Sequence, residues 1–199
     1  MLTVEEIIEP LILPAPNLTD AEFEAYCEQY PDHMLEYTPE GELIVMPPTD
    51  EDTGYRNAGI TTQLMNCMPN SKAGRVVDSS TGFKLPSGAR RSPDAAWISR
   101  GRSKARLCPE FVVELLSPSD RVRKTHAKML EWIENGAELG WMINPRNRSV
   151  TVYRPGCEPE VLTGIGDIGG EGPVAGFVLG LCRPPISRMP GSRPIAANR

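Results

Sequence analysis

The sequence predicts an α/β fold in which short buried strands alternate with amphipathic helices. Residues 111–116 are rich in Phe, Val and Leu, which favour a buried strand, and residues 94–98 form a second run of this kind. Apolar side chains recur at helical spacing over residues 54–68 and 120–135, which predicts two helices. At 199 residues the chain is long enough for one domain with a sizeable core.

We expect this single domain to span residues 1–182. Residues 1–46 are expected to form an N-terminal extension, and residues 47–182 are expected to form the core. From residue 183 onward Pro, Ser, Arg, Ala and Asn dominate without periodicity. Residues 183–199 are therefore predicted to be a disordered tail.

The extension is predicted to contain one helix and one β-hairpin. The stretch before residue 16 is expected to end in a proline-rich loop. Thr19 and Glu22 match a capping box, so a surface helix is expected to begin there and to end near Tyr30. Residues 33–46 contain two short apolar runs around a Pro-Glu-Gly turn, which is typical of a hairpin.

The second half of the core is predicted to contain one helix and a further hairpin. The helix over residues 120–135 should bury Val122, Met129 and Ile133. Two apolar runs, over residues 138–144 and 149–154, are separated by a polar turn and predict the hairpin.

Charge is distributed unevenly along the chain, although the net charge is only −5. Residues 1–52 hold fourteen acidic and no basic side chains, whereas residues 53–199 carry a net charge of +9. Residues 84–128 alone hold eleven basic and four acidic side chains. A local positive field favours a polyanionic partner. The alternative is that the acidic and basic segments pair with each other.

The composition favours a cytoplasmic protein without membrane association. No stretch is apolar for long enough to span a bilayer, and the N-terminus lacks the basic and apolar regions of a signal peptide. The five cysteines are widely spread and never occur as CxxC, which argues for reduced thiols. Two histidines are too few for a histidine-rich metal site. No small-molecule cofactor is expected.

Two carboxylates interrupt or begin the apolar strands and predict a metal site. Glu114 lies inside the run 111–116, where a carboxylate is costly unless it is paired or bound to a metal. Asp94 stands at the start of the other strand, so the two acids meet at one sheet end if the strands are neighbours. The backbone carbonyl of Leu115 is a candidate third ligand, and Lys128 on the next helix is close enough to reach back. Such a site suits Mg²⁺ or Mn²⁺ and a phosphodiester.

Two long stretches carry a resemblance to a known family. They are SSTGFKLPSGARRSPDAAWIS, over residues 79–99, and CPEFVVELLSPSDRVRKTHAKMLEWIENGAELGWMINPRNRSVTVYRPG, over residues 108–156. They resemble the Uma-type family of restriction endonucleases, within the PD-(D/E)XK nuclease superfamily, and the similarity covers roughly residues 46–177. The resemblance implies a restriction-endonuclease-like mixed central sheet flanked by helices, Mg²⁺ or Mn²⁺ as cofactor, and hydrolysis of DNA.

The resemblance also implies roles for individual residues. Asp94 matches the aspartate of the PD motif, and Glu114 matches the acid of the (D/E)XK motif. The third place of that motif is Leu116 rather than lysine. In Uma-type proteins the lysine is supplied by the next helix, where Lys128 falls. Asp94, Glu114 and Lys128 are therefore the expected catalytic residues.

Further residues match the family pattern less closely. Asp52 falls where relatives carry an acid before the first core helix, which makes it a potential extra metal ligand, although Glu51 is an alternative and Asp52 is equally open to a capping role. Asp78 fits a supporting role on the strand before the site. Arg121 and Lys124 share a helix face with Lys128 and suit phosphate binding, although many relatives carry an acid at the position of Lys124.

Three functional hypotheses remain open from the sequence. The first is a metal-dependent endonuclease acting on DNA, and the second is a nuclease fold kept for nucleic-acid or partner binding without turnover. The third is a structural protein with neither activity. Because cleavage of two antiparallel strands is easiest for a two-fold assembly, we expect a homodimer.

Overall fold

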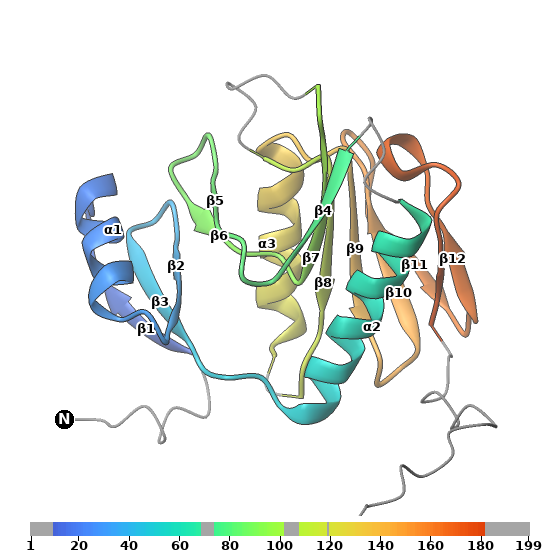
Figure 1. The fold of residues 1–199 in the computed structure, drawn as a ribbon, viewed down its shortest axis with the longest axis horizontal. Helices are drawn as coiled ribbons and strands as arrows, with labels where there is room; N and C mark the ends of the chain where they lie inside the picture. Colours follow the sequence, from blue (N-terminus) through green and yellow to red (C-terminus); the bar gives the residue numbers. More distant parts are fainter. Residues whose placement is uncertain (1–9, 69–73, 102–107, 119, 182–199) are drawn as a thin grey trace, which may run out of the picture.

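A six-stranded mixed β-sheet forms the middle layer of the protein (Figure 1). Its strands are β4 (Gly74–Asp78), β7 (Ala95–Ser99), β8 (Phe111–Leu115), β9 (Leu139–Asn144), β10 (Ser149–Tyr153) and β11 (Glu160–Thr163). The order is β11-β10-β9-β8-β7-β4, with β8 and β9 parallel and the other pairs antiparallel. This computed structural model describes residues 10–68, 74–101, 108–118 and 120–181, so the predicted tail lies outside the described residues.

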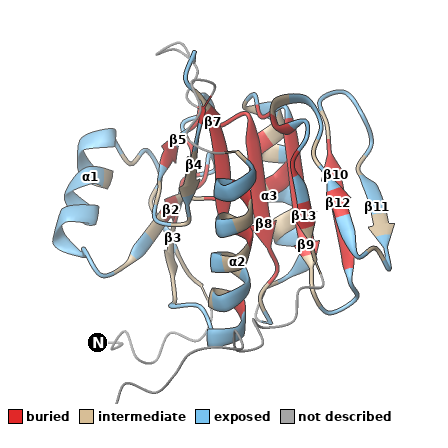
Figure 2. Cartoon of the chain, turned by 45° about the vertical axis from the view of Figure 1, so that its right-hand side comes forward, coloured by how far each residue is buried: buried red, intermediate tan, exposed pale blue. Residues whose placement is uncertain are grey.

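Helices cover both faces of the central sheet. Helix α2 (Glu51–Cys67) packs on one face, together with the ribbon of β12 (Asp167–Gly169) and β13 (Val178–Gly180) and the short 3₁₀ turn Gly172–Val174. Helix α3 (Val122–Glu134) packs on the other face. Figure 2 shows the central strands as the buried part of the molecule between partly exposed helices. The predicted mixed sheet flanked by helices is confirmed.

Two apolar clusters hold these layers together, one on each face of the sheet. Ile60 and Leu64 of α2 join the cluster around Trp141, whereas Met129 and Trp132 of α3 join the other. Gly140 of β9 has no side chain to separate β9 from α3, and a Cβ at this position would overlap the tip of Met129. The parallel β8–α3–β9 crossover therefore brings α3 close over the centre of the sheet.

The N-terminal hairpin belongs to a second sheet, which also takes two short strands from residues 83–91 and is called the N-terminal sheet below. The sheet has the order β1-β3-β2-β6-β5, and α1 (Asp20–Gln29) lies beside it (Figure 1). Its strands are β1 (Leu11–Pro14), β2 (Met34–Tyr37), β3 (Glu42–Met46), β5 (Phe83–Lys84) and β6 (Arg90–Arg91). The predicted hairpin is β2–β3, and Thr19 caps α1 with Glu22 in the expected capping box.

Two expectations about individual elements were wrong, and the structure decides one alternative that was open. The proline-rich loop is strand β1, because its Leu-Ile-Leu run pairs with β3 and its proline lies at the strand end. Val122 is 51% exposed, since it is the first residue of α3. Trp132 is fully buried in the apolar cluster on the α3 face, and the expected Ile133 packs against that cluster but is only partly buried. The N-cap of α2 is Asp50 rather than Asp52, with its Oδ1 accepting a hydrogen bond from the Thr53 N–H at 3.1 Å.

Among the described residues, no helix combines the length and the apolar composition that a bilayer-spanning segment requires.

Candidate active site

Sheet register brings Asp94 and Glu114 together. Strands β7 and β8 are antiparallel, and Ala95 lies opposite Val113. One further step along this register places Asp94 opposite Glu114, at the end of β8. The Leu115 N–H donates to Asp94 Oδ2 at 2.7 Å, which ties the aspartate to the neighbouring strand. The predicted meeting of the two acids at one sheet end is thus present in the structure.

Lys128 lies between this pair and the N-terminal sheet. Its Nζ is 3.0 Å from Glu114 Oε1 and 2.8 Å from Glu36 Oε1. It also donates to the Ser92 carbonyl oxygen at 2.8 Å. An ammonium group has three protons, so these three partners use its whole donor capacity.

Glu36 is a member of the cluster that the sequence interpretation missed. It lies in β2 and is only 4% exposed. Besides Lys128, it accepts hydrogen bonds from the Ser92 N–H at 3.0 Å and from Arg91 Nη1 at 3.1 Å. The signal was available, because Glu36 interrupts the strand Met-Leu-Glu-Tyr as Glu114 interrupts β8. The predicted hairpin was not expected to face the site, so this carboxylate was not considered.

Besides Arg91, three side chains complete the polar network: Glu131, Trp132 and Asn57. The sequence interpretation assigned none of these four residues to the site. Arg91 also pairs with Glu131 of α3, with its Nη2 2.6 Å from Oε2. The Trp132 Nε1–H donates to Glu114 Oε1 at 2.9 Å. Asn57 Nδ2 of α2 donates to Asp94 Oδ1 at 3.1 Å, while the Asn57 Oδ1 atom is buried without a hydrogen-bond partner.

The network holds more negative than positive charge when all its groups are ionised. It contains four carboxylates and two cations: Glu36, Asp94, Glu114, Glu131, Arg91 and Lys128. Burial alone would raise the pKa of Glu36, but Lys128 and Arg91 outweigh burial and hold this pKa below its ordinary value. Glu36 therefore stays ionised, and the excess negative charge falls on other carboxylates.

That excess falls on the pair predicted from the sequence. Burial raises the pKa of Asp94 to about 6, despite the hydrogen bond from Leu115 and the attraction of Lys128. Burial likewise raises the pKa of Glu114 to about 7; Lys128 opposes this, and the charge of Asp94 adds to it. For Lys128, burial acts to lower the pKa, but Glu114 and Glu36 raise it above its ordinary value. The site therefore holds a permanent ammonium beside two carboxylates that lack a full complement of positive charge.

The other predicted residues lie outside this buried network. Asp52 is exposed in the first turn of α2 and pairs with Arg56 at 2.9 Å. Asp78 is an exposed residue opposite Ala95, and its Oδ1 accepts from the Ser80 N–H at 3.1 Å. Arg121 and Lys124 stand exposed at the start of α3.

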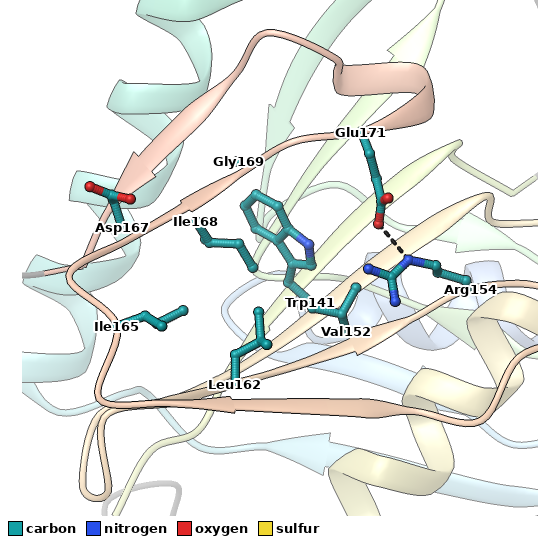
Figure 3. Close-up of a pocket in the computed structure, with 9 residues that line it drawn as sticks. All are labelled: Trp141, Val152, Arg154, Leu162, Ile165, Asp167, Ile168, Gly169 and Glu171. Carbon is teal, nitrogen blue, oxygen red and sulfur yellow. Dashed lines mark hydrogen bonds and ion pairs between the residues drawn. The ribbon is translucent and has the colours of Figure 1, made fainter.

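A cavity of about 240 Å³ lies elsewhere, on the α2 face of the sheet (Figure 3). Its apolar lining includes Trp141 and Val152, and its rim carries Arg154, which pairs with Glu171 at 2.5 Å. Glu114 points to the opposite face, toward α3, so this cavity is separate from the polar network. Within the described ranges, no group of three or more His, Cys, Asp or Glu side chains is arranged to hold a metal ion.

The mixed sheet and its flanking helices define a restriction-endonuclease-like fold. The family model described as "Uma2: Putative restriction endonuclease" matches residues 20–178, so the chain belongs to the Uma2 family. A crystal structure of "a putative nuclease belonging to DUF820" from Anabaena variabilis is similar in fold, with a TM-score of 0.66 and 18% sequence identity. The similarity covers 91% of this chain and 96% of that one. No curated protein shows significant sequence similarity to the chain.

Proposed function

We propose that this protein is a metal-dependent endonuclease that hydrolyses phosphodiester bonds of DNA. The observation that carries the proposal is the buried pair Asp94 and Glu114 beside Lys128, in a network whose four carboxylates have only two cations. A single divalent cation would supply the missing two positive charges. Membership of a family described as restriction endonucleases supports the same chemistry.

The residues present fit a hard cation such as Mg²⁺ or Mn²⁺. Carboxylate oxygens are the ligands that these ions prefer, and a site that keeps several waters needs only one or two carboxylates. Asp94 and Glu114 would hold the cation, with the backbone carbonyl of Leu115 as a third oxygen. Such a cation supplies charge neutralisation at the scissile phosphate and activates water for attack.

The chain's own groups prepare the reaction around this position. Lys128 would orient the attacking water or stabilise the negative charge that develops on the phosphate. The Trp132 Nε1–H holds one Glu114 oxygen in place, and Asn57 does the same for Asp94. These two hydrogen bonds fix the orientation of the carboxylates before a substrate binds.

The exposed residues near the site would act on the DNA backbone. Arg121 and Lys124 at the start of α3 would bind phosphates on either side of the cleaved bond. Asp52 would join as an extra metal ligand once it leaves Arg56, and Asp78 would support the strand beside Asp94. We further propose that the protein acts as a homodimer, with one site for each strand.

A second candidate function is DNA binding without turnover. It is favoured by the exposed ion pair of Asp52 with Arg56, because this pair occupies the carboxylate that is proposed as an extra metal ligand. Binding that weakens steeply with salt, in the absence of cleavage with any divalent metal, would support this alternative.

Plasmid nicking with matched glutamine variants tests the proposal. Supercoiled DNA is incubated with Mn²⁺ and wild type, Glu114→Gln or Glu110→Gln. Glu110 is an equally buried glutamate that accepts from the Ser99 N–H at 3.0 Å, away from Asp94. We expect Glu114→Gln to lose at least about a hundredfold in nicking rate, as expected for loss of a metal ligand. Equal nicking by all three proteins would mean a contaminating nuclease and would refute the proposal.

A further inference from the structure

We propose that Glu36 is a positioning residue of the active site, which holds the Lys128 ammonium away from the place of the cation. The proposal rests on the metal-dependent function proposed above. It assigns to the N-terminal sheet a part in the site, although that sheet is separate from the central sheet that carries Asp94 and Glu114.

Two cations compete for Glu114, namely the Lys128 ammonium and the proposed metal ion. Lys128 Nζ lies 3.0 Å from Glu114 Oε1 and 3.2 Å from Oε2, so it contacts both oxygens of a proposed metal ligand. A divalent cation on Glu114 would repel the ammonium over a few ångströms. Without a second anchor, Lys128 would either exclude the cation or be driven out of the site.

Glu36 provides this anchor from strand β2. Its Oε1 is the nearest carboxylate oxygen to Lys128 Nζ, at 2.8 Å, compared with 3.0 Å for Glu114. Ser92 supports the same position, because its carbonyl oxygen accepts from Nζ at 2.8 Å. Lys128 can therefore give up its bond to Glu114 and remain in the site.

Glu36 is itself held in place by several hydrogen bonds. Its Oε2 accepts from Arg91 Nη1 at 3.1 Å, and its Oε1 accepts from the Ser92 N–H at 3.0 Å. Arg91 is bonded in turn to Glu131 of α3, the helix that carries Lys128. These contacts fix Glu36 relative to Lys128 and to the segment that leads into Asp94. Because Glu36 is fixed in this way, Lys128 would move toward Glu36 when a cation binds to Glu114.

Metal binding provides the first test, read by calorimetry with Mn²⁺ in the absence of DNA. In Glu36→Gln the ammonium has only Glu114 as a charged partner, so it should compete directly with the metal. We expect Mn²⁺ binding to weaken about 10- to 100-fold, the range found for residues that support metal ligands. The control Glu110→Gln should stay within about twofold of wild type. Unchanged Mn²⁺ affinity in Glu36→Gln would overturn the proposal.

A double-mutant cycle without metal tests the contact itself. Urea unfolding is compared for wild type, Glu36→Gln, Lys128→Met and the double variant at pH 8. If Glu36 acts through Lys128, its replacement should change the unfolding equilibrium constant at least about tenfold less when Lys128 is absent. The same fold-change in both backgrounds would overturn the proposal. If Lys128→Met does not fold, Lys128→Gln takes its place, and the cycle then measures the charge part of the contact, because Gln keeps only a neutral donor for Glu36.

The two measurements separate the two proposals. A wild-type protein that binds no Mn²⁺ would refute the metal-dependent function, and with it the withdrawal of Lys128 from a cation. If the wild type binds Mn²⁺ but the double-mutant cycle is additive, the metal-dependent function is supported and the positioning role of Glu36 is refuted.

Discussion

Replacing Asp94 with asparagine should stabilise the metal-free protein while it removes a proposed metal ligand. The Asp94 carboxylate is buried, and its pKa is raised from 3.8 to about 6. A raised carboxyl pKa means that the folded state binds the proton more tightly than the unfolded state. The free energy of unfolding therefore falls as the pH rises from about 4 to above 6.

The size of this effect follows from the pKa shift. A rise from 3.8 to about 6 corresponds to about 3 kcal/mol of stability lost by pH 8. The asparagine side chain of the Asp94→Asn variant carries no charge and avoids this loss, and its Oδ1 can still accept from the Leu115 N–H. Its Nδ2 would meet the Asn57 Oδ1 atom after a flip of the Asn57 amide, and this oxygen has no partner in the wild type. We therefore expect the variant to be more stable by about 3 kcal/mol at pH 8 and equal to wild type near pH 4.

Urea unfolding between pH 4 and pH 8, in the presence of a chelator, measures this difference. Asp52→Asn is the matched control, because it makes the same substitution at an exposed carboxylate outside the buried network. Saturating Mn²⁺ should then reverse the order, since only the wild type gains binding free energy from a complete site. A difference between Asp94→Asn and wild type that is the same at every pH, or a less stable variant at pH 8, would refute the reasoning.

Two further predictions concern the fold and need only thermal or urea unfolding. Gly74→Ala should destabilise by about 1–3 kcal/mol because the new Cβ would overlap the Trp97 ring and the Ile98 carbonyl oxygen of the neighbouring strand β7. Gly59→Ala in α2 meets open space and should stabilise by about 0.5–1 kcal/mol. If Gly74→Ala were as stable as Gly59→Ala, β4 would not pack closely against Trp97. Thr19→Ala should cost about 1 kcal/mol because it removes the acceptor for the Glu22 N–H in the capping box, and an unchanged midpoint would show that α1 adds nothing to stability.

The elements that could be predicted from the sequence are those with a strong local pattern. Strand β8 and helix α3 have the β-branched run and the helical spacing that burial on a sheet requires. The β9–β10 hairpin and the capping box at Thr19 depend on residues close together in the chain. Strand β1 was missed because its pairing with β3 is a long-range contact, while its prolines locally favour a loop.

The candidate site, too, could be predicted only in part from the sequence. A carboxylate inside an apolar strand can be recognised from the sequence alone, because burying a charge is costly in any buried strand. This pattern identified Glu114 first and then Asp94. The partners of those acids were not visible. Asn57 and Trp132 reach the acids from two helices, and Glu36 reaches their lysine from a second sheet. The sequence separations of these contacts follow no helix or strand periodicity.

The amino-acid order alone was therefore enough for the α/β class, the family and the acid pair with its lysine. Only the folded chain decided that Lys128 is shared between Glu114 and Glu36, and that Asp52 faces Arg56. The physical reason is that burial and charge balance are properties of the assembled layers. A side chain's neighbours across a sheet register or under a helix set its electrostatics, and these neighbours are fixed only when the layers pack.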